Sequence, residues 1–140
     1  MIVIDANAAL EIVLETNIGR QLMSVFELED TTAPLIFVDE VANSLWKYQR
    51  IGDITKQECV NLHRAALSLV DCYVNDDELY PEALSRAIQT NHSVYDMLYL
   101  TLAKRCDAQL FTRDKKLIKL CHENNVDCID LVDLLSTVEE

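Results

Sequence analysis

Residues that break regular structure are scarce in this sequence, which has only two glycines and two prolines among 140 residues. An all-β fold with many tight turns needs more of both, so this scarcity argues against it and favours long helices with short connections. Long apolar runs are also missing, because no stretch reaches the roughly 18 residues that would span a bilayer. We therefore expect no membrane partner.

Paired cysteines are missing as well. The five cysteines are an odd number without a CxxC motif, which argues against a disulfide framework and indicates buried thiols in a reducing compartment. Cys121, His122 and Cys128 stay open as metal ligands, although zinc sites usually show closely spaced pairs. The N-terminal MIVIDAN has no basic segment followed by an apolar core, so we expect no secretory signal and a cytoplasmic location.

Positive charge is in short supply, since 12 basic residues face 24 acidic ones and the formal net charge is −12. Taken alone, this balance argues against a nucleic-acid-binding protein. The basic residues are unevenly placed, however, and residues 101–120 hold six of the 12. Two readings of that segment stay open: a solvated helix face and a surface that contacts phosphates.

The overall composition is that of a globular protein, with 50% hydrophobic and 26% charged residues. A chain of this length buries about two thirds of its unfolded surface and has room for a sizeable core. Repeats, linkers and low-complexity segments are absent from the sequence. We expect one domain that spans residues 1–140.

Strand and helix patterns alternate along the chain. Extended, mostly apolar segments predict five strands, near residues 1–5, 31–34, 71–74, 108–112 and 126–129. Apolar residues at helical spacing predict helices near residues 8–13, 18–28, 36–50, 55–70, 93–106 and 114–123. Pro81 is expected to open a further helix, and a last short helix is expected from Asp130. This alternation is typical of a parallel sheet covered on both faces.

Two acids follow predicted strands. In α/β folds of this kind, function gathers beyond the carboxyl ends of the strands, where the order of connections reverses. Asp5 ends the first strand, and Asp114 comes two residues after the strand that closes with Thr112. Both side chains are candidates to point into one crevice, although Asp114 also has an ordinary reading as a turn or cap residue.

Two more acids lie on predicted helices. Asp96 interrupts the apolar stretch SVYDMLYLTLA, where an uncompensated buried carboxylate costs several kcal/mol or becomes protonated. Ser93 and Asp96 also have the spacing of a capping box, and such a cap does not exclude a ligand role. Glu40 opens its helix beside Val41 on the apolar stripe, whereas Asp39 points about 100° away. Taken singly, Asp39 or Glu40 reads as a solvated first-turn residue.

The four acids are more informative as a group than singly. Gathered in one place, their like charges repel one another unless a divalent cation neutralises them. Hard oxygen ligands with retained water suit Mg²⁺ or Mn²⁺. The candidate metal ligands are Asp5, Glu40, Asp96 and Asp114.

Three segments carry a resemblance to a known family. IVIDAN, DEVANSLWKY and SVYDMLYLTLAKRCDAQLFTRDKKL, in this order, resemble the PIN-domain ribonucleases, and most closely the VapC toxins of prokaryotic toxin–antitoxin pairs. The resemblance covers essentially the whole chain. It implies a three-layer α/β/α PIN-like fold with a central, mainly parallel sheet of four to five short strands. It also implies that the four acids form the catalytic, metal-binding site with Asn7 and Thr112 as polar supports, and alignment on VANSL favours Glu40 over Asp39.

The same resemblance implies an activity and partners. The expected protein is a Mg²⁺- or Mn²⁺-dependent endoribonuclease that hydrolyses RNA, with Arg113, Lys115 and Lys116 available to hold the RNA backbone. A homodimer and a small inhibitory VapB-like antitoxin are also implied, and the apolar helices near residues 18–28 and 36–48, with Trp46 and Tyr48, could supply the surfaces. A noncatalytic PIN-like or receiver-like binding module is the alternative. A receiver-like domain, however, needs a lysine after its last strand, where this chain has Asp130.

Overall fold

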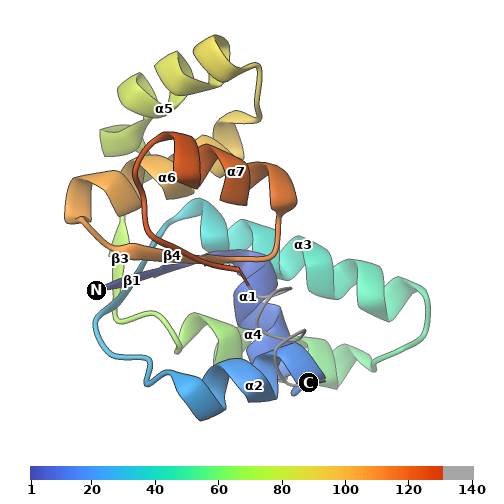
Figure 1. Ribbon diagram of the computed structural model, residues 1–140. Helices are drawn as coiled ribbons and strands as arrows, with labels where there is room; N and C mark the ends of the chain where they lie inside the picture. Colours follow the sequence, from blue (N-terminus) through green and yellow to red (C-terminus); the bar gives the residue numbers. More distant parts are fainter. Residues whose placement is uncertain (131–140) are drawn as a thin grey trace.

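The computed structural model describes residues 1–130, and its strands form one sheet (Figure 1). The strands are β1 (Ile2–Ile4), β2 (Thr31–Pro34), β3 (Cys72–Val74), β4 (Gln109–Thr112) and β5 (Cys128–Asp130). Their order across the sheet is β3-β2-β1-β4-β5, and every neighbouring pair is parallel. The parallel sheet that the alternating pattern predicts is confirmed.

Helices cover both faces of this sheet. They are α1 (Ala6–Val13), α2 (Asn17–Val25), α3 (Ile36–Arg50), α4 (Lys56–Leu67), α5 (Asp76–Thr90), α6 (Val94–Cys106) and α7 (Lys115–Glu123). Figure 1 shows α5, α6 and α7 on one side of the sheet and α1, α2, α3 and α4 on the other. The predicted three-layer α/β/α fold is confirmed. None of the helices described here combines the length and hydropathy needed to cross a membrane.

The strand order places a crevice between two particular strands. From β1 the chain builds outward to β2 and β3, and it then returns to add β4 on the other side of β1. Val3 pairs with Thr32 of β2 and with Leu110 of β4, so β1 is the central strand. Parallel sheets open a crevice at the carboxyl ends of the strands where the order reverses in this way. Asp5 and Asp114 follow the two strands that flank it.

Helix α6 is apolar on nearly every side because it lies between two layers. All seven residues from 97 to 103 are buried, and α6 contacts the sheet on one side and α5 on the other. The helix is therefore part of the core along most of its length. Its first turn extends to the carboxyl edge of the sheet, so Asp96 lies where the buried helix meets the crevice.

Some element boundaries differ from the predictions. Pro81 does not open a helix but lies inside α5, which begins at Asp76. The start is set by Asn75, whose side chain accepts a hydrogen bond from Asp77 N–H, and by three acids in the first turn that favour the positive end of the helix dipole. Helix α2 ends at Val25, and β5 runs to Asp130. The predicted last helix lies outside the described residues, so the prediction of one domain over residues 1–140 stays a prediction.

Candidate metal centre at the carboxyl edge of the sheet

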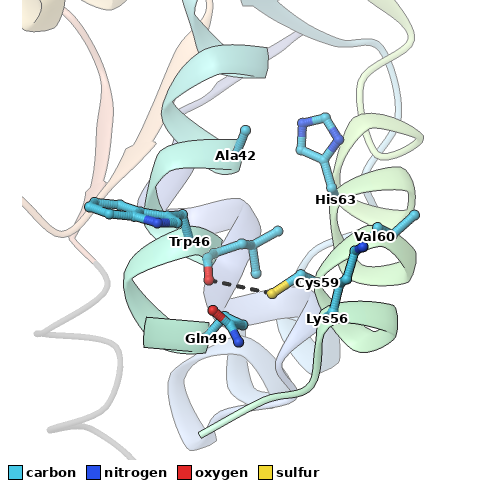
Figure 2. A pocket seen from close by; sticks show the side chains of 8 residues that line it. Ala42, Trp46, Gln49, Lys56, Cys59, Val60 and His63 are labelled. Atoms are coloured by element: carbon cyan, nitrogen blue, oxygen red, sulfur yellow. Dashed lines mark hydrogen bonds between the residues drawn. The ribbon is translucent and has the colours of Figure 1, made fainter. Parts of the chain in front are cut away.

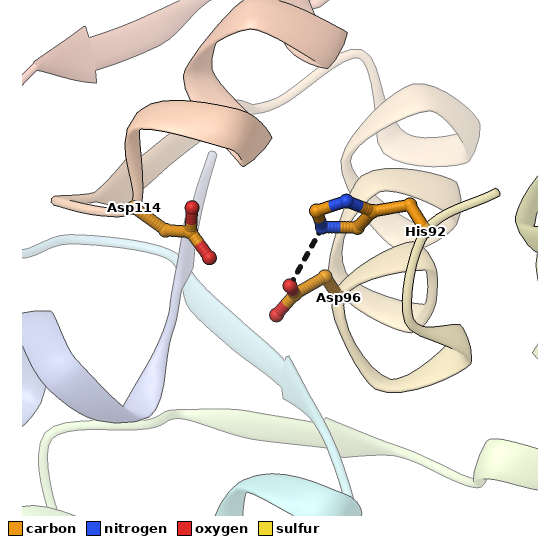
Figure 3. A group of neighbouring side chains, drawn as sticks. All are labelled: His92, Asp96 and Asp114. Carbon is orange, nitrogen blue, oxygen red and sulfur yellow. Dashed lines mark hydrogen bonds and ion pairs between the residues drawn. The ribbon is translucent and has the colours of Figure 1, made fainter. Parts of the chain in front are cut away.

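Three potential metal ligands converge at the crevice. His92, Asp96 and Asp114 each offer one ligand atom, and these atoms lie within 4.8 Å of one another (Figure 3). The residues come from the α5–α6 junction, the first turn of α6 and the start of α7. Within residues 1–130, this is the one group of three or more His, Cys, Asp or Glu side chains that is placed to hold a metal ion. The alternative set of Cys121, His122 and Cys128 does not converge in this way.

Asp96 turns toward His92 rather than back onto its own helix. Its Oδ2 is 2.8 Å from His92 Nε2. Ser93 does cap α6, but it accepts from Tyr95 N–H, so the reciprocal pair of a capping box is not formed. Burial raises the pKa of Asp96, the contact with His92 lowers it, and the charge of Asp114 raises it again. The predicted capping box between Ser93 and Asp96 is therefore wrong, and the Asp96 carboxylate faces the crevice.

Asp114 serves as a helix cap and faces the crevice as well. Its Oδ1 accepts hydrogen bonds from Lys116 N–H at 2.9 Å and Leu117 N–H at 3.3 Å, which fixes the carboxylate at the N-terminus of α7. Only one of its two oxygens is used in this way. The cap reading of Asp114 is thus correct and compatible with a ligand role, since the carboxylate lies beside Asp96 and His92 (Figure 3).

Asp5 is the most deeply buried of the four acids, with 6% of its surface exposed. Its Oδ1 accepts from Ala8 N–H at 2.8 Å and so caps α1. The pKa of Asp5 is raised to about 7, mainly by burial and also by the charges of Asp96 and Glu40. Hydrogen bonds from Thr112 and Ala8 lower this pKa and so offset part of the rise. Thr112 also accepts from Asp114 N–H at 3.1 Å, so it links the ends of β1 and β4.

Glu40 is held in place by a buried tyrosine. Tyr99, which is 1% exposed and lies one turn after Asp96 on α6, donates its hydroxyl proton to Glu40 Oε1 at 2.7 Å. Burial raises the pKa of Glu40, the hydrogen bond from Tyr99 lowers it, and the charges of Asp96 and Asp76 raise it. Asp39 is exposed. Of the two neighbouring acids, Glu40 is the one that the fold turns toward the crevice.

The charge of these acids is not balanced by lysine or arginine. Across the described part of the chain, His92 is the one basic side chain that pairs with any of the four. Asp5, Glu40 and Asp96 are buried or half-buried carboxylates with raised pKa values, and such an arrangement is unfavourable unless a cation joins it. The donors are carboxylate oxygens and one imidazole nitrogen, which fits a divalent metal ion.

Other predicted residues lie beside this centre rather than in it. Asn7 and Arg113 are exposed and line a cavity of about 380 Å³ between α1 and α3. Arg113 forms an ion pair with Glu11. Lys115 and Lys116 are exposed at the start of α7, beside Asp114. Of the four predicted acids, the structure brings Asp96 and Asp114 to within ligand distance of each other. Asp5 and Glu40 lie close enough to Asp96 for their charges to interact, but they are not members of the same group of potential ligands.

Two residues of this centre, Tyr99 and His92, were not predicted from the sequence. Tyr99 follows Asp96 by three positions, a spacing that places two helical residues on one face, and this signal could have identified it. His92 precedes Asp96 by four, but it lies outside the helix, where that spacing rule does not apply. The position of its ring is decided by how α5 is joined to α6.

Comparison with known proteins agrees with this architecture. The family model of the PIN domain matches residues 2–123. This chain belongs to the PIN-domain family. It is 31% identical over 83 residues to Ribonuclease VapC3 of Pyrobaculum aerophilum, and that match covers 56% of this chain and 61% of the relative's length. The VapC resemblance carried by the sequence segments is therefore confirmed.

Solved structures share the fold of this PIN domain. PAE2754 from Pyrobaculum aerophilum has a TM-score of 0.72 at 22% identity, over 99% of this chain and 96% of that one. VapBC2 from Rickettsia felis, bound to a promoter DNA fragment, has a TM-score of 0.65 at 16% identity, over 93% and 98%. A toxin–antitoxin complex from Klebsiella pneumoniae has a TM-score of 0.61 at 19% identity, over 83% and 88%.

Proposed function

We propose that this PIN domain is a divalent-metal-dependent endoribonuclease that hydrolyses RNA phosphodiester bonds, and that it is the toxin of a toxin–antitoxin pair. The observation that carries the proposal is the cluster of buried and half-buried acids at the switch point of the sheet, which has no lysine or arginine partner among residues 1–130. Its family and its ribonuclease relative supply the reaction class.

Each acid has a proposed role that follows from its contacts. Asp96 and Asp114 would hold Mg²⁺ or Mn²⁺, since both belong to the group of potential ligands. Asp5 would join them, because its buried carboxylate interacts with the charge of Asp96. When bound, such an ion lowers the pKa of water and stabilises the charge on the departing oxygen. Glu40 Oε1 is occupied by the Tyr99 hydroxyl, which leaves Oε2 to orient the attacking water and accept its proton. The Thr112 hydroxyl is hydrogen-bonded to both Asp5, after β1, and the Asp114 N–H, after β4, and so holds these two acids near each other.

The rim of the crevice is suited to an RNA backbone. Arg113, Lys115 and Lys116 lie directly before and after Asp114. The cavity beside Arg113 is also lined by Lys47 and Arg50 of α3, so basic side chains from two elements gather there. Phosphate contacts by lysine and arginine supply most of the affinity of sequence-independent nucleic-acid binding, and they weaken as salt rises. Asn7 completes this rim as a neutral donor.

The antitoxin has a candidate docking face on the α3–α4 pair. A cavity of about 420 Å³ opens between these helices and is lined mainly by apolar atoms (Figure 2). Trp46 and Val60 are about half exposed on its walls, and the Cys59 thiol contacts the Leu45 carbonyl oxygen at 3.5 Å on its floor. Grooves of this kind accept the apolar face of an amphipathic helix. The toxin is proposed to dimerise through a separate apolar surface.

Cleavage assays with matched variants test the enzymatic proposal. Purified wild-type protein with Mn²⁺ is expected to cut single-stranded RNA, and Asp5→Asn or Asp96→Asn should each reduce the rate by at least about 10³-fold, because each removes a charge that holds the ion. Undiminished cutting by both variants would overturn the site. EDTA should abolish cutting by the wild type.

The docking proposal has its own test. Val60→Asp should prevent copurification with a coexpressed VapB-like antitoxin while RNA cleavage by the isolated toxin stays unchanged. Copurification that survives this change would place the antitoxin elsewhere. A wild-type protein that binds Mn²⁺ but cuts no RNA under any condition would favour the noncatalytic PIN-like alternative. The strand order β3-β2-β1-β4-β5 and the match to the PIN-domain family model argue against the receiver-like alternative.

A further inference from the structure

His92 is fixed in space before any ligand arrives. Its backbone N–H donates to the Ala87 carbonyl at 3.2 Å, across Asn91, which ends α5 in a left-handed conformation with φ 54°. The next residue, Ser93, is the cap of α6. Two helix ends therefore hold the backbone on either side of the imidazole, so little entropy is lost when the ring binds something.

The imidazole ring is directed into the acid cluster. Its side chain is only 12% exposed, and its Nε2 lies 2.8 Å from Asp96 Oδ2. The same ring offers a nitrogen within 4.8 Å of a ligand oxygen of Asp114 (Figure 3). The imidazole nitrogen, the Asp96 oxygen and the Asp114 oxygen thus form one group, in which every pair of ligand atoms lies within 4.8 Å.

The spacing of these atoms is that of ligands around one ion. With metal–ligand distances of about 2.1 Å, adjacent ligands of an octahedral ion are about 3 Å apart and opposite ligands about 4.2 Å apart. The 2.8 Å contact of His92 with Asp96 matches an adjacent pair, and the 4.8 Å limit for the group requires only a small contraction. When a metal ion replaces the hydrogen bond between Nε2 and Asp96, the ring proton would reside on Nδ1 and the Nε2 lone pair would point to the ion.

We propose that His92 Nε2 is a direct ligand of the divalent ion, which makes the centre a mixed imidazole and carboxylate site that prefers Mn²⁺ to Mg²⁺. This inference rests on the proposed metal-dependent function. Imidazole nitrogen binds first-row transition metals well, whereas Mg²⁺ strongly favours oxygen donors and water. An all-oxygen site made of the acids alone would discriminate less between the two ions.

The direct test is the magnetic coupling between bound Mn²⁺ and nitrogen. Electron spin-echo envelope modulation of the wild-type protein with one equivalent of Mn²⁺ should show coupling to a histidine ¹⁴N nucleus. Growth with ¹⁵N-histidine should shift that signal. The chain has three histidines, so His63→Gln and His122→Gln are matched controls that should keep the coupling, while His92→Gln should lose it.

Affinity supplies a second readout that does not depend on activity. His92→Gln should raise the Kd for Mn²⁺ by at least about tenfold. The Kd for Mg²⁺, measured by competition, should change by less than about threefold, because Mg²⁺ gains little from the imidazole. Circular dichroism should show that the variant is folded.

The outcomes separate this inference from the proposed function. Mn²⁺ that binds to the wild type without nitrogen coupling would overturn direct ligation by His92 and leave the metal-dependent nuclease standing. Coupling that survives His92→Gln would overturn it as well. Failure of the wild type to bind Mn²⁺ at all would instead contradict the proposed metal centre itself.

Discussion

The two ends of helix α6 carry charged clusters of opposite character. Near its N-terminus, Asp96 lies among acids whose pKa values burial and mutual repulsion raise. Near its C-terminus, Arg105 donates to Glu82 Oε1 at 3.0 and 2.7 Å, and this contact lowers the pKa of Glu82. Arg86 joins that cluster through Glu82 and through the buried Thr101 hydroxyl.

This difference separates a structural cluster from a binding site. Charges that neutralise one another within the chain need nothing further, and partly exposed ion pairs of this kind contribute little to stability. At the other end, helix caps, Thr112 and Tyr99 fix the positions of the acids by hydrogen bonds. No lysine or arginine among residues 1–130 cancels the repulsion between their charges. Perturbed pKa values in a crevice are typical of functional sites.

The largest effect is expected from neutralising an acid of the uncompensated end. Glu40→Gln should lower the rate of RNA cleavage by at least about 10²-fold, since the water would lose the group that accepts its proton. Asp39→Asn is the matched control and should leave the rate unchanged, because Asp39 is exposed. Single-turnover cleavage of a labelled oligoribonucleotide measures both. Equal losses in the two variants would contradict the choice of Glu40.

The next effect concerns the free energy of unfolding without metal. Because folding raises the pKa of Asp5 from 3.8 to about 7, the native state binds protons more tightly, and the stability from this group falls as pH rises between these values. Asp5→Asn keeps the capping oxygen and removes the charge. Its stability advantage over the wild type should grow by about 2 kcal/mol from about pH 5.5 to pH 8.

Urea unfolding in EDTA at about pH 5.5 and pH 8 measures the change in the stability advantage of Asp5→Asn. In a separate series without EDTA, Mn²⁺ at a hundred times its Kd should stabilise the wild type by about 2.7 kcal/mol and Asp5→Asn by far less. An advantage for Asp5→Asn that did not change with pH would contradict the raised pKa of Asp5 in the folded protein.

A smaller effect separates cations that have no acidic partner among residues 1–130, such as Lys47 and Arg50, from a cation that is already paired with an acid. Lys47→Glu combined with Arg50→Glu should weaken RNA binding by about tenfold at low salt, since both line the cavity beside Arg113. Arg105→Gln is the matched control and should bind RNA normally, because Arg105 is paired with Glu82. Fluorescence anisotropy with the inactive Asp96→Asn protein isolates binding from cleavage. Equal weakening by all these changes would indicate only a general charge effect.

The smallest effect is expected at the compensated end. Glu82→Gln should shift the melting temperature by no more than about 2 °C, because the pair with Arg105 is exposed to solvent. RNA cleavage and Mn²⁺ binding should stay at wild-type values. A large loss of activity in this variant, measured by the same cleavage assay, would break the distinction between the two ends of α6.

The sequence by itself determined the layers and most of the acids. Alternating strand and helix patterns, with few breakers, specify a parallel sheet covered on both faces, since each pattern reflects a local period of apolar residues. The acids that follow β1 and β4 could be predicted for the same reason, because parallel strands end at one edge. The helix around Pro81 was misplaced because the capping and acidic start at Asn75 outweighs the preference of proline for the first turn.

Only the tertiary structure decided how the polar groups meet. The choice of Glu40 over Asp39 depends on Tyr99, which is 59 residues away along the chain, and the place of His92 depends on the turn that joins α5 to α6. The deep burial that raises the pKa of Asp5 comes from packing between β1, β4 and α1. Such contacts join segments that are far apart in the sequence, so local sequence patterns cannot predict them. The free energy of a buried charge depends on all of its neighbours in space, and these neighbours come from several segments.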